Sequence, residues 1–215
     1  MLLFQLVKKD LLLIKRYVVV TMLLLVAIPL FIMRTAPSLP GMLSFLYMVA
    51  LGELMLLQAL SQTEAKSPRA VALLCAAPYS RNTVVQAKYL FFFLTFAYCY
   101  VAYTLMTLDA NTGALLDVMS VFIVLLCSIT IFAIYLPVEF RYGLVKAKFI
   151  FMIAVFAFSL GPILISSLFS NISIDFSALE ALPYGIKIAA LALASVVILW
   201  VSMTASLRIF NGKDL

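Results

Sequence analysis

The chain has 215 residues, of which 66% are hydrophobic and 11% are charged. In a soluble domain about half of the residues are apolar and about a quarter are charged. Too few charges are therefore present to cover a folded surface in water. This excludes a soluble enzyme and a disordered chain. The absence of histidine also excludes a histidine metal site and a Ser-His-Asp triad.

Residues 1–16 are predicted to form an amphipathic helix at the membrane interface. Leu3, Leu6 and Ile14 follow helical spacing, and Lys8 and Lys15 are available to lipid headgroups. A segment of this kind lies with its apolar side at the acyl boundary and its cations on anionic lipid. A plain extension of the first membrane span is the alternative.

Six apolar runs follow along the chain. A helix needs about 20 residues to cross a bilayer, and backbone groups in hydrocarbon must form their hydrogen bonds within the segment, which favours helices. We therefore predict an all-α, polytopic membrane protein, a single domain over residues 1–215 with six transmembrane helices. The runs are residues 17–33, 40–61, 89–108, 118–136, 149–174 and 188–207.

The second run contains an acid, Glu53, deep within the predicted span. A charged side chain at the bilayer centre costs about 2.5–3.5 kcal/mol on insertion scales, so Glu53 is expected to face the helix bundle or a cavity. Gly52, Gln58 and Ser61 make its surroundings less apolar. Two interpretations stay open. Glu53 either contacts a proton or a substrate during transport, or is a protonated glutamate that bonds to a neighbouring helix.

The longest polar stretch between two spans is residues 62–88. Pro68 is tolerated in the first turn of a helix, and Pro78 ends that helix because it disfavours helical geometry in the residue before it. Ser80 is a candidate cap for a further helix that begins at Arg81. We predict a short helix parallel to the membrane. It either docks a cytoplasmic partner or is an ordinary interfacial connector.

A second loop is predicted on the same side of the membrane, at residues 137–148. If the N-terminus is cytoplasmic, 13 of the 15 Lys and Arg residues lie in inside segments, and Arg34 and Lys187 lie outside. Cytoplasmic loops generally carry such an excess, so both termini are predicted to be cytoplasmic. Topology then explains the net charge of +6, and nucleic acid is not expected as a partner.

The sequence shows no pattern typical of nucleotide binding or catalysis. The phosphate-binding pattern G-x-x-x-x-G-K-[ST] does not occur, so ATP-driven transport would need another polypeptide as the ATPase. Cys75, Cys99 and Cys127 suggest neither a disulfide framework nor a zinc site. An ion-coupled secondary transporter, with Glu53 as its candidate buried charge, is one alternative. A membrane-embedded enzyme is another, although the loop acids are scattered.

Several short motifs stand on the predicted inner segments. They are Lys9-Asp10-Leu11-Leu12-Leu13, Thr63-Glu64-Ala65-Lys66, Ala77-Pro78-Tyr79-Ser80-Arg81, Ala87-Lys88-Tyr89-Leu90 and the run from Leu136 to Lys148. In their order and placement they resemble the motifs of small type-2 ABC exporter permeases. Permeases of phenol-soluble-modulin exporters of Gram-positive bacteria are the most similar group.

The resemblance implies a permease subunit of an ATP-driven exporter in a bacterial plasma membrane, not an enzyme. It implies that residues 62–88 form a coupling loop that contacts an ABC ATPase, which would bind ATP and magnesium. It further implies a second permease copy or paralogue, and an amphipathic or antimicrobial peptide as cargo. The expected docking and coupling residues are Glu64, Lys66, Arg69, Pro78, Arg81, Glu139, Arg141 and Lys146.

Overall fold

The fold is known from a computed structural model that describes most of the chain as helices. The described residues are 12, 14–35, 41–66, 81–109, 116–143, 146–153, 156–157 and 183–211. The labelled helices are α2 (Lys15–Thr35), α3 (Gly41–Lys66), α5 (Arg81–Asp109), α6 (Val118–Tyr142) and α9 (Tyr184–Asn211). Residues 146–153 are also helical, and the described residues contain no strand. For this part of the chain the predicted all-α class is confirmed.

Four of the described helices, α3, α5, α6 and α9, are long and apolar enough to cross a membrane. They coincide with the second, third, fourth and sixth predicted spans. The first predicted span lies in α2, of which Tyr17–Ala27 is an apolar helix. The fifth, residues 149–174, lies mostly outside the described residues, as does most of the predicted interfacial helix, residues 1–16. The count of six spans therefore stays a prediction.

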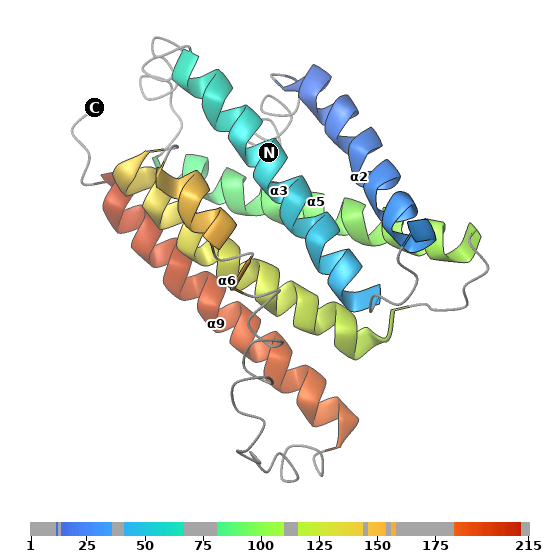
Figure 1. Cartoon of the computed structure of the whole chain (residues 1–215). Helices are drawn as coiled ribbons and strands as arrows, with labels where there is room; N and C mark the ends of the chain where they lie inside the picture. The colour runs from blue at the N-terminus through green and yellow to red at the C-terminus, as the bar shows by residue number, and fades with distance from the viewer. Residues whose placement is uncertain are drawn as a thin grey trace.

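The helices form a bundle in which α5 crosses obliquely behind α3 (Figure 1). One end of the bundle holds the start of α2, the end of α3, the start of α5 and the ends of α6 and α9. We call it the basic end, because Lys15, Lys66, Arg81, Arg141 and Arg208 lie in the helix segments there. The grouping matches the charge pattern on which the predicted orientation rests.

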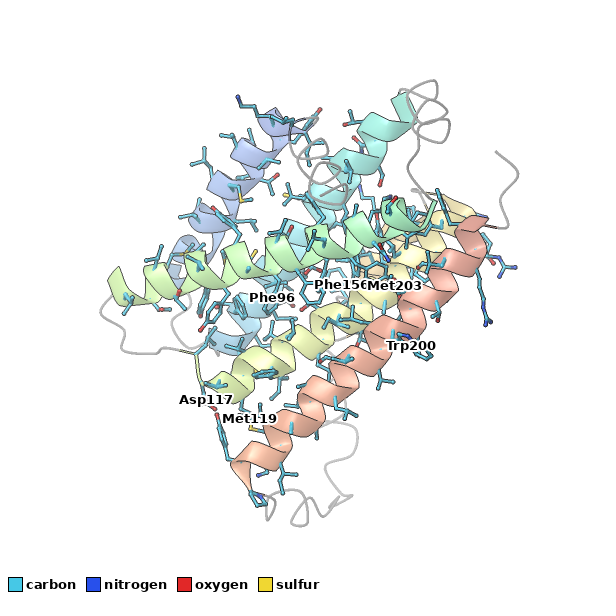
Figure 2. All side chains as sticks on the ribbon, turned by 180° about the vertical axis from the view of Figure 1, so that it is seen from behind. Phe96, Asp117, Met119, Phe156, Trp200 and Met203 are labelled. Atoms are coloured by element: carbon cyan, nitrogen blue, oxygen red, sulfur yellow. The ribbon has the colours of Figure 1, made fainter. Side chains whose placement is uncertain are left out.

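α6 and α9 run in the same direction and pack along most of their length. Tyr184, the first residue of α9, donates a hydrogen bond of 2.9 Å to Asp117, the residue before α6, which is labelled in Figure 2. Near their last residues the rings of Phe140 and Phe210 lie 5.2 Å apart. Because the two helices are parallel, the chain has to return to the far end of the bundle between them.

Two apolar clusters fill the interior, one at each end of the bundle. The basic-end cluster includes Leu57, Phe92 and Phe132, and the far-end cluster includes Phe45 and Tyr103. Rings pack within both clusters: Phe92 and Phe132 have centroids 4.6 Å apart, and Phe45 and Tyr103 5.2 Å apart. Such offset and tilted aromatic pairs add to the contact energy of the helices.

The outward surface of α9 is strongly apolar. Leu193, Val196 and Trp200 are between 65% and 68% exposed, and Trp200 points away from the bundle (Figure 2). Helix faces with several large and strongly exposed apolar side chains are unusual on a soluble monomer. They are expected where hydrocarbon is the solvent, so the surface agrees with the composition of the chain.

The helices extend further into the polar segments than the apolar runs indicate. α3 continues to Lys66 and α5 begins at Arg81, as the pattern after Pro78 predicts, so both ends of the predicted loop 62–88 are helical. Its middle, residues 67–80, lies outside the described residues. The predicted loop 137–148 is wrong in its first half, because α6 continues through Pro137 to Tyr142. The reason lies in the contacts of α6 at this point.

Candidate functional site: a buried polar cluster at the basic end

Glu139 joins three helices at the basic end. Its Oε1 atom lies 3.0 Å from Nζ of Lys88 on α5 and accepts a hydrogen bond from the hydroxyl of Ser61 on α3. The Lys88 and Glu139 side chains are 6% and 8% exposed. Removing one partner of a buried ion pair costs about 3–5 kcal/mol, because the other charge is left unpaired.

Lys88 also contacts the residue that follows Glu139. Its Nζ atom lies 5.1 Å from the centre of the Phe140 ring, within the range of a cation–π interaction. The second carboxylate oxygen of Glu139, Oε2, is buried, and the hydroxyl of Tyr135, one turn earlier on α6, also interacts with this carboxylate. The pair is thus enclosed by polar contacts from its own helix and from two others.

A hydrogen-bond network explains why α6 continues past Pro137. Proline has no N–H, so the carbonyl of Ala133, four residues earlier, has no donor in its own helix. The hydroxyl of Ser202 on α9 donates to this carbonyl at 3.0 Å. Neighbouring Ser and Thr side chains generally make proline tolerable in membrane helices in this way. The sequence pattern of α6 alone does not reveal this compensation.

Tyr89 extends the same network to α5. Its hydroxyl lies 2.7 Å from Oγ of Ser202 and 3.3 Å from Oγ of Ser206. The Tyr89 ring packs against Phe132 with centroids 5.3 Å apart. The adjacent residues Lys88 and Tyr89 therefore bind α5 to α6 and α9 respectively, and the four helices α3, α5, α6 and α9 meet at one polar cluster.

The end of α6 places two predicted docking residues on the surface. Arg141 and Lys146 are exposed, and each cation lies 5.3 Å from the ring centre of Tyr142. Gly143 ends the helix with a φ of 84°, a conformation that glycine adopts at little cost. Its N–H donates to the carbonyl of Glu139 at 3.0 Å.

The other predicted docking residues lie at or beyond the helix ends. Glu64 and Lys66 belong to the last turn of α3, and Arg81 is the first residue of α5. Arg69 and Pro78 lie outside the described residues. Of the predicted set, Glu139 is buried and paired with Lys88, so its side chain faces the bundle and not the surface.

Glu53 lies between the two apolar clusters on α3. Its side chain is 1% exposed, and neither carboxyl oxygen has a hydrogen-bond partner among the described residues. The expected bond to a neighbouring helix is therefore not formed with any described group. Gly52 beside it lies close to α2 and α5: a Cβ there would come within 2.9 Å of Leu25 and 3.4 Å of Cys99.

Comparison with protein families identifies the chain. Residues 5–211 match the family described as ABC-2 family transporter protein. The chain belongs to this family. No curated protein and no solved structure matches it. An ABC-2 permease is the membrane subunit of an ABC transporter, which agrees with the apolar helices described above.

Several residues of this permease's polar cluster were not predicted from the sequence. Lys88 and Tyr89 stand in a recognised motif, yet neither was expected to contact Glu139 or α9. A usable signal existed for the ion pair: Lys88 and Glu139 both stand close to the predicted inner ends of neighbouring spans. For Ser202 and Ser206 no such signal is present, because small hydroxyl residues are common in membrane helices.

Proposed function

We propose that this permease is the transmembrane subunit of an ATP-driven exporter that moves amphipathic peptides out of a bacterial cell. In this proposal the basic end faces the cytoplasm and binds an ABC ATPase, and a second permease copy or paralogue completes the pathway. The observation that carries the proposal is the family match over residues 5–211. The resemblance of the inner motifs to exporters of amphipathic peptide toxins supports the choice of cargo.

The exposed cations at the end of α6 support docking of an ATPase at the basic end. Arg141 and Lys146 flank the Tyr142 ring and are open to a partner. α3 ends and α5 begins there, on either side of residues 67–80. A cationic patch favours association with an acidic surface, through both the encounter rate and the choice of partner.

The interior of the bundle favours an amphiphilic cargo over a hydrophilic one. At mid-helix Thr95 and Ser128 are buried, and their hydroxyls donate to carbonyls of their own helices. Apart from these hydroxyls and Glu53, the described interior at mid-helix consists largely of the two apolar clusters. A hydrophilic solute would lose its hydration there without compensation, whereas an amphipathic helix keeps an apolar face against such walls.

Reconstitution tests the proposal. The permease is co-expressed with an ABC ATPase subunit from the same organism and placed in liposomes. We expect ATP hydrolysis to depend on the permease, and a fluorescent amphipathic helical peptide to accumulate in the lumen with ATP. A scrambled peptide of equal composition is the control. Uptake that persists without ATP but ends with an ionophore would favour a secondary transporter, and ATP hydrolysis by the permease alone would contradict the proposal.

Charge reversal at Arg141 tests the docking surface. We expect Arg141→Glu to weaken ATPase binding about tenfold, because a reversed interface charge leaves its partner unpaired. Arg208→Glu is the matched control, since Arg208 is also exposed at the basic end but lies on α9. Co-purification and ATP turnover are measured for both. Equal binding by the two variants would remove Arg141 from the interface.

A further inference from the structure

The polar cluster connects the two helices that flank the predicted coupling loop. Ser61 precedes residues 67–80 on α3, and Lys88 follows them on α5. Both side chains bind the same oxygen of Glu139. A displacement of either helix end therefore changes the contacts of Glu139, whichever of the two moves.

Glu139 stands on a part of α6 that is held differently from the rest of the helix. Before Pro137, α6 is fixed to α9 through the bond from Ser202 to the Ala133 carbonyl. Beyond Pro137, Glu139 and Phe140 contact Lys88 of α5, and Phe140 also packs against Phe210 of α9. Because proline removes a helical hydrogen bond, helices bend most readily at this residue. The ion pair therefore connects α5 to the last turns of α6, beyond the residue at which the helix bends most readily.

Stability alone does not account for the ion pair. The cation and the carboxylate have both left water, with side chains only 6% and 8% exposed. Replacing such a pair with apolar residues of similar volume is often neutral or stabilising. A role in coupling, by contrast, needs an interaction that makes α6 follow α5.

We propose that the Lys88–Glu139 pair, with Ser61, transmits movement of the ATPase-driven loop to the end of α6, which bends at Pro137. Lys88 and Glu139 are positioning residues in this scheme, and neither contacts cargo or nucleotide. The inference rests on the proposed function, since it needs an ATPase that moves residues 67–80. It adds to that function the path by which the movement reaches a third helix.

Spin labels at the two ends of α6 test the proposal in the full complex with the ATPase. The three natural cysteines are replaced by alanine, and labels are placed at Val118 and Tyr142, which are both exposed. Pulsed electron paramagnetic resonance gives their distance with and without ATP and vanadate. Labels at Val118 and Ile134, both before Pro137, are the matched control. In the otherwise native chain we expect nucleotide to shift only the first distance.

The deciding variant is Lys88→Met/Glu139→Leu, which removes both charges together. We expect it to keep its melting temperature and its ATP hydrolysis, because no unpaired charge remains, but to lose the nucleotide-dependent shift between Val118 and Tyr142. A full shift of the Val118–Tyr142 distance in this variant would overturn the proposal. The absence of that shift in the chain with Lys88 and Glu139 intact would also overturn it. Failure of the native permease to bind or stimulate the ATPase would instead overturn the proposed function.

A conservative pair of variants keeps the test decisive if the double variant does not fold. Glu139→Asp retains the charge but draws the carboxylate back toward α6, so the shift should be reduced. Adding Lys88→Arg, whose side chain reaches further, should restore it. A purely structural role predicts the same shift for all folded variants, and that result would also overturn the proposal.

Discussion

Two buried carboxylates of this permease differ sharply in their surroundings. Glu139 at the basic end binds Lys88 and Ser61, whereas Glu53 lies between the two apolar clusters without a hydrogen-bond partner among the described residues. Their exposed fractions are similarly small, 8% for Glu139 and 1% for Glu53. Burial alone therefore does not show the role of a carboxylate in a membrane protein. The groups that contact the carboxylate show it.

The difference follows from position along the helices. Glu139 and Lys88 stand near the ends of helices that meet at the basic end, where long side chains are commonly found in membrane proteins. Glu53 stands near the middle of α3, where its neighbours on α3, such as Val49 and Leu56, belong to the apolar clusters. A polar group without a partner is unusual there. We expect opposite changes in stability when the cation that pairs with Glu139 and the carboxyl of Glu53 are removed.

The largest expected effect comes from Lys88→Met alone. It leaves Glu139 buried and unpaired, so the free energy of unfolding should fall by about 3–5 kcal/mol. Lys148→Met is the matched control at the same end and should change it by less than about 0.5 kcal/mol. Thermal unfolding in detergent measures both. A loss as small as that of the control would mean that the ion pair does not form.

Removing the carboxyl group of Glu53 should change the free energy of unfolding in the opposite direction. Glu53→Leu deletes a buried polar group that has no partner among the described residues, and such a group costs about 1–3 kcal/mol. We expect a gain in stability of about 1 kcal/mol, and near-native stability for Glu53→Gln, which stays polar. A clear loss with Glu53→Leu would reveal a partner. Lost transport at normal stability in Glu53→Gln would place Glu53 in the transport path.

A smaller effect should separate the Pro137 network from the ion pair. Ser202→Ala removes the donor to the Ala133 carbonyl, and hydrogen bonds between membrane helices are worth about 0.6 kcal/mol on average and up to about 1.7. In a Pro137→Ala background α6 gains its own donor, so the same substitution should cost less. Ser195→Ala is the control, because Ser195 bonds within α9. An equal loss of stability from Ser202→Ala in the native and in the Pro137→Ala background would mean that Ser202 does not compensate for the donor that proline lacks.

Much of the fold was predictable because hydrocarbon imposes simple rules. Apolar runs of sufficient length predicted four described helices that are able to cross a membrane, and Pro78 with Ser80 predicted the start of α5 at Arg81. The inner loop after Leu136 was not predicted correctly, because proline usually ends a helix. Here a hydroxyl from α9 replaces the missing donor, and nothing near Pro137 in the sequence indicates it.

The candidate site was predictable only in part for the same reason. Glu139 was assigned to a docking surface because it stands in an inner motif, and the packing of α3 and α5 turns its side chain inward instead. Arg141 and Lys146, which stand just beyond it, are exposed as a docking surface requires. The last turn of α6 thus carries both the buried Glu139 and the exposed Arg141, and only the packing of neighbouring helices distinguishes them.

The sequence by itself determined the hydrocarbon surroundings of the protein, its all-α class and the end of the bundle at which the basic residues gather. Its apolar excess requires hydrocarbon around the helices, and its basic residues cluster in the segments that form one end of the bundle. The tertiary structure alone decided which polar groups meet. Partners such as Lys88 and Glu139, or Ser202 and the Ala133 carbonyl, are distant in sequence, and hydrogen bonding acts only over the few ångströms that helix packing sets.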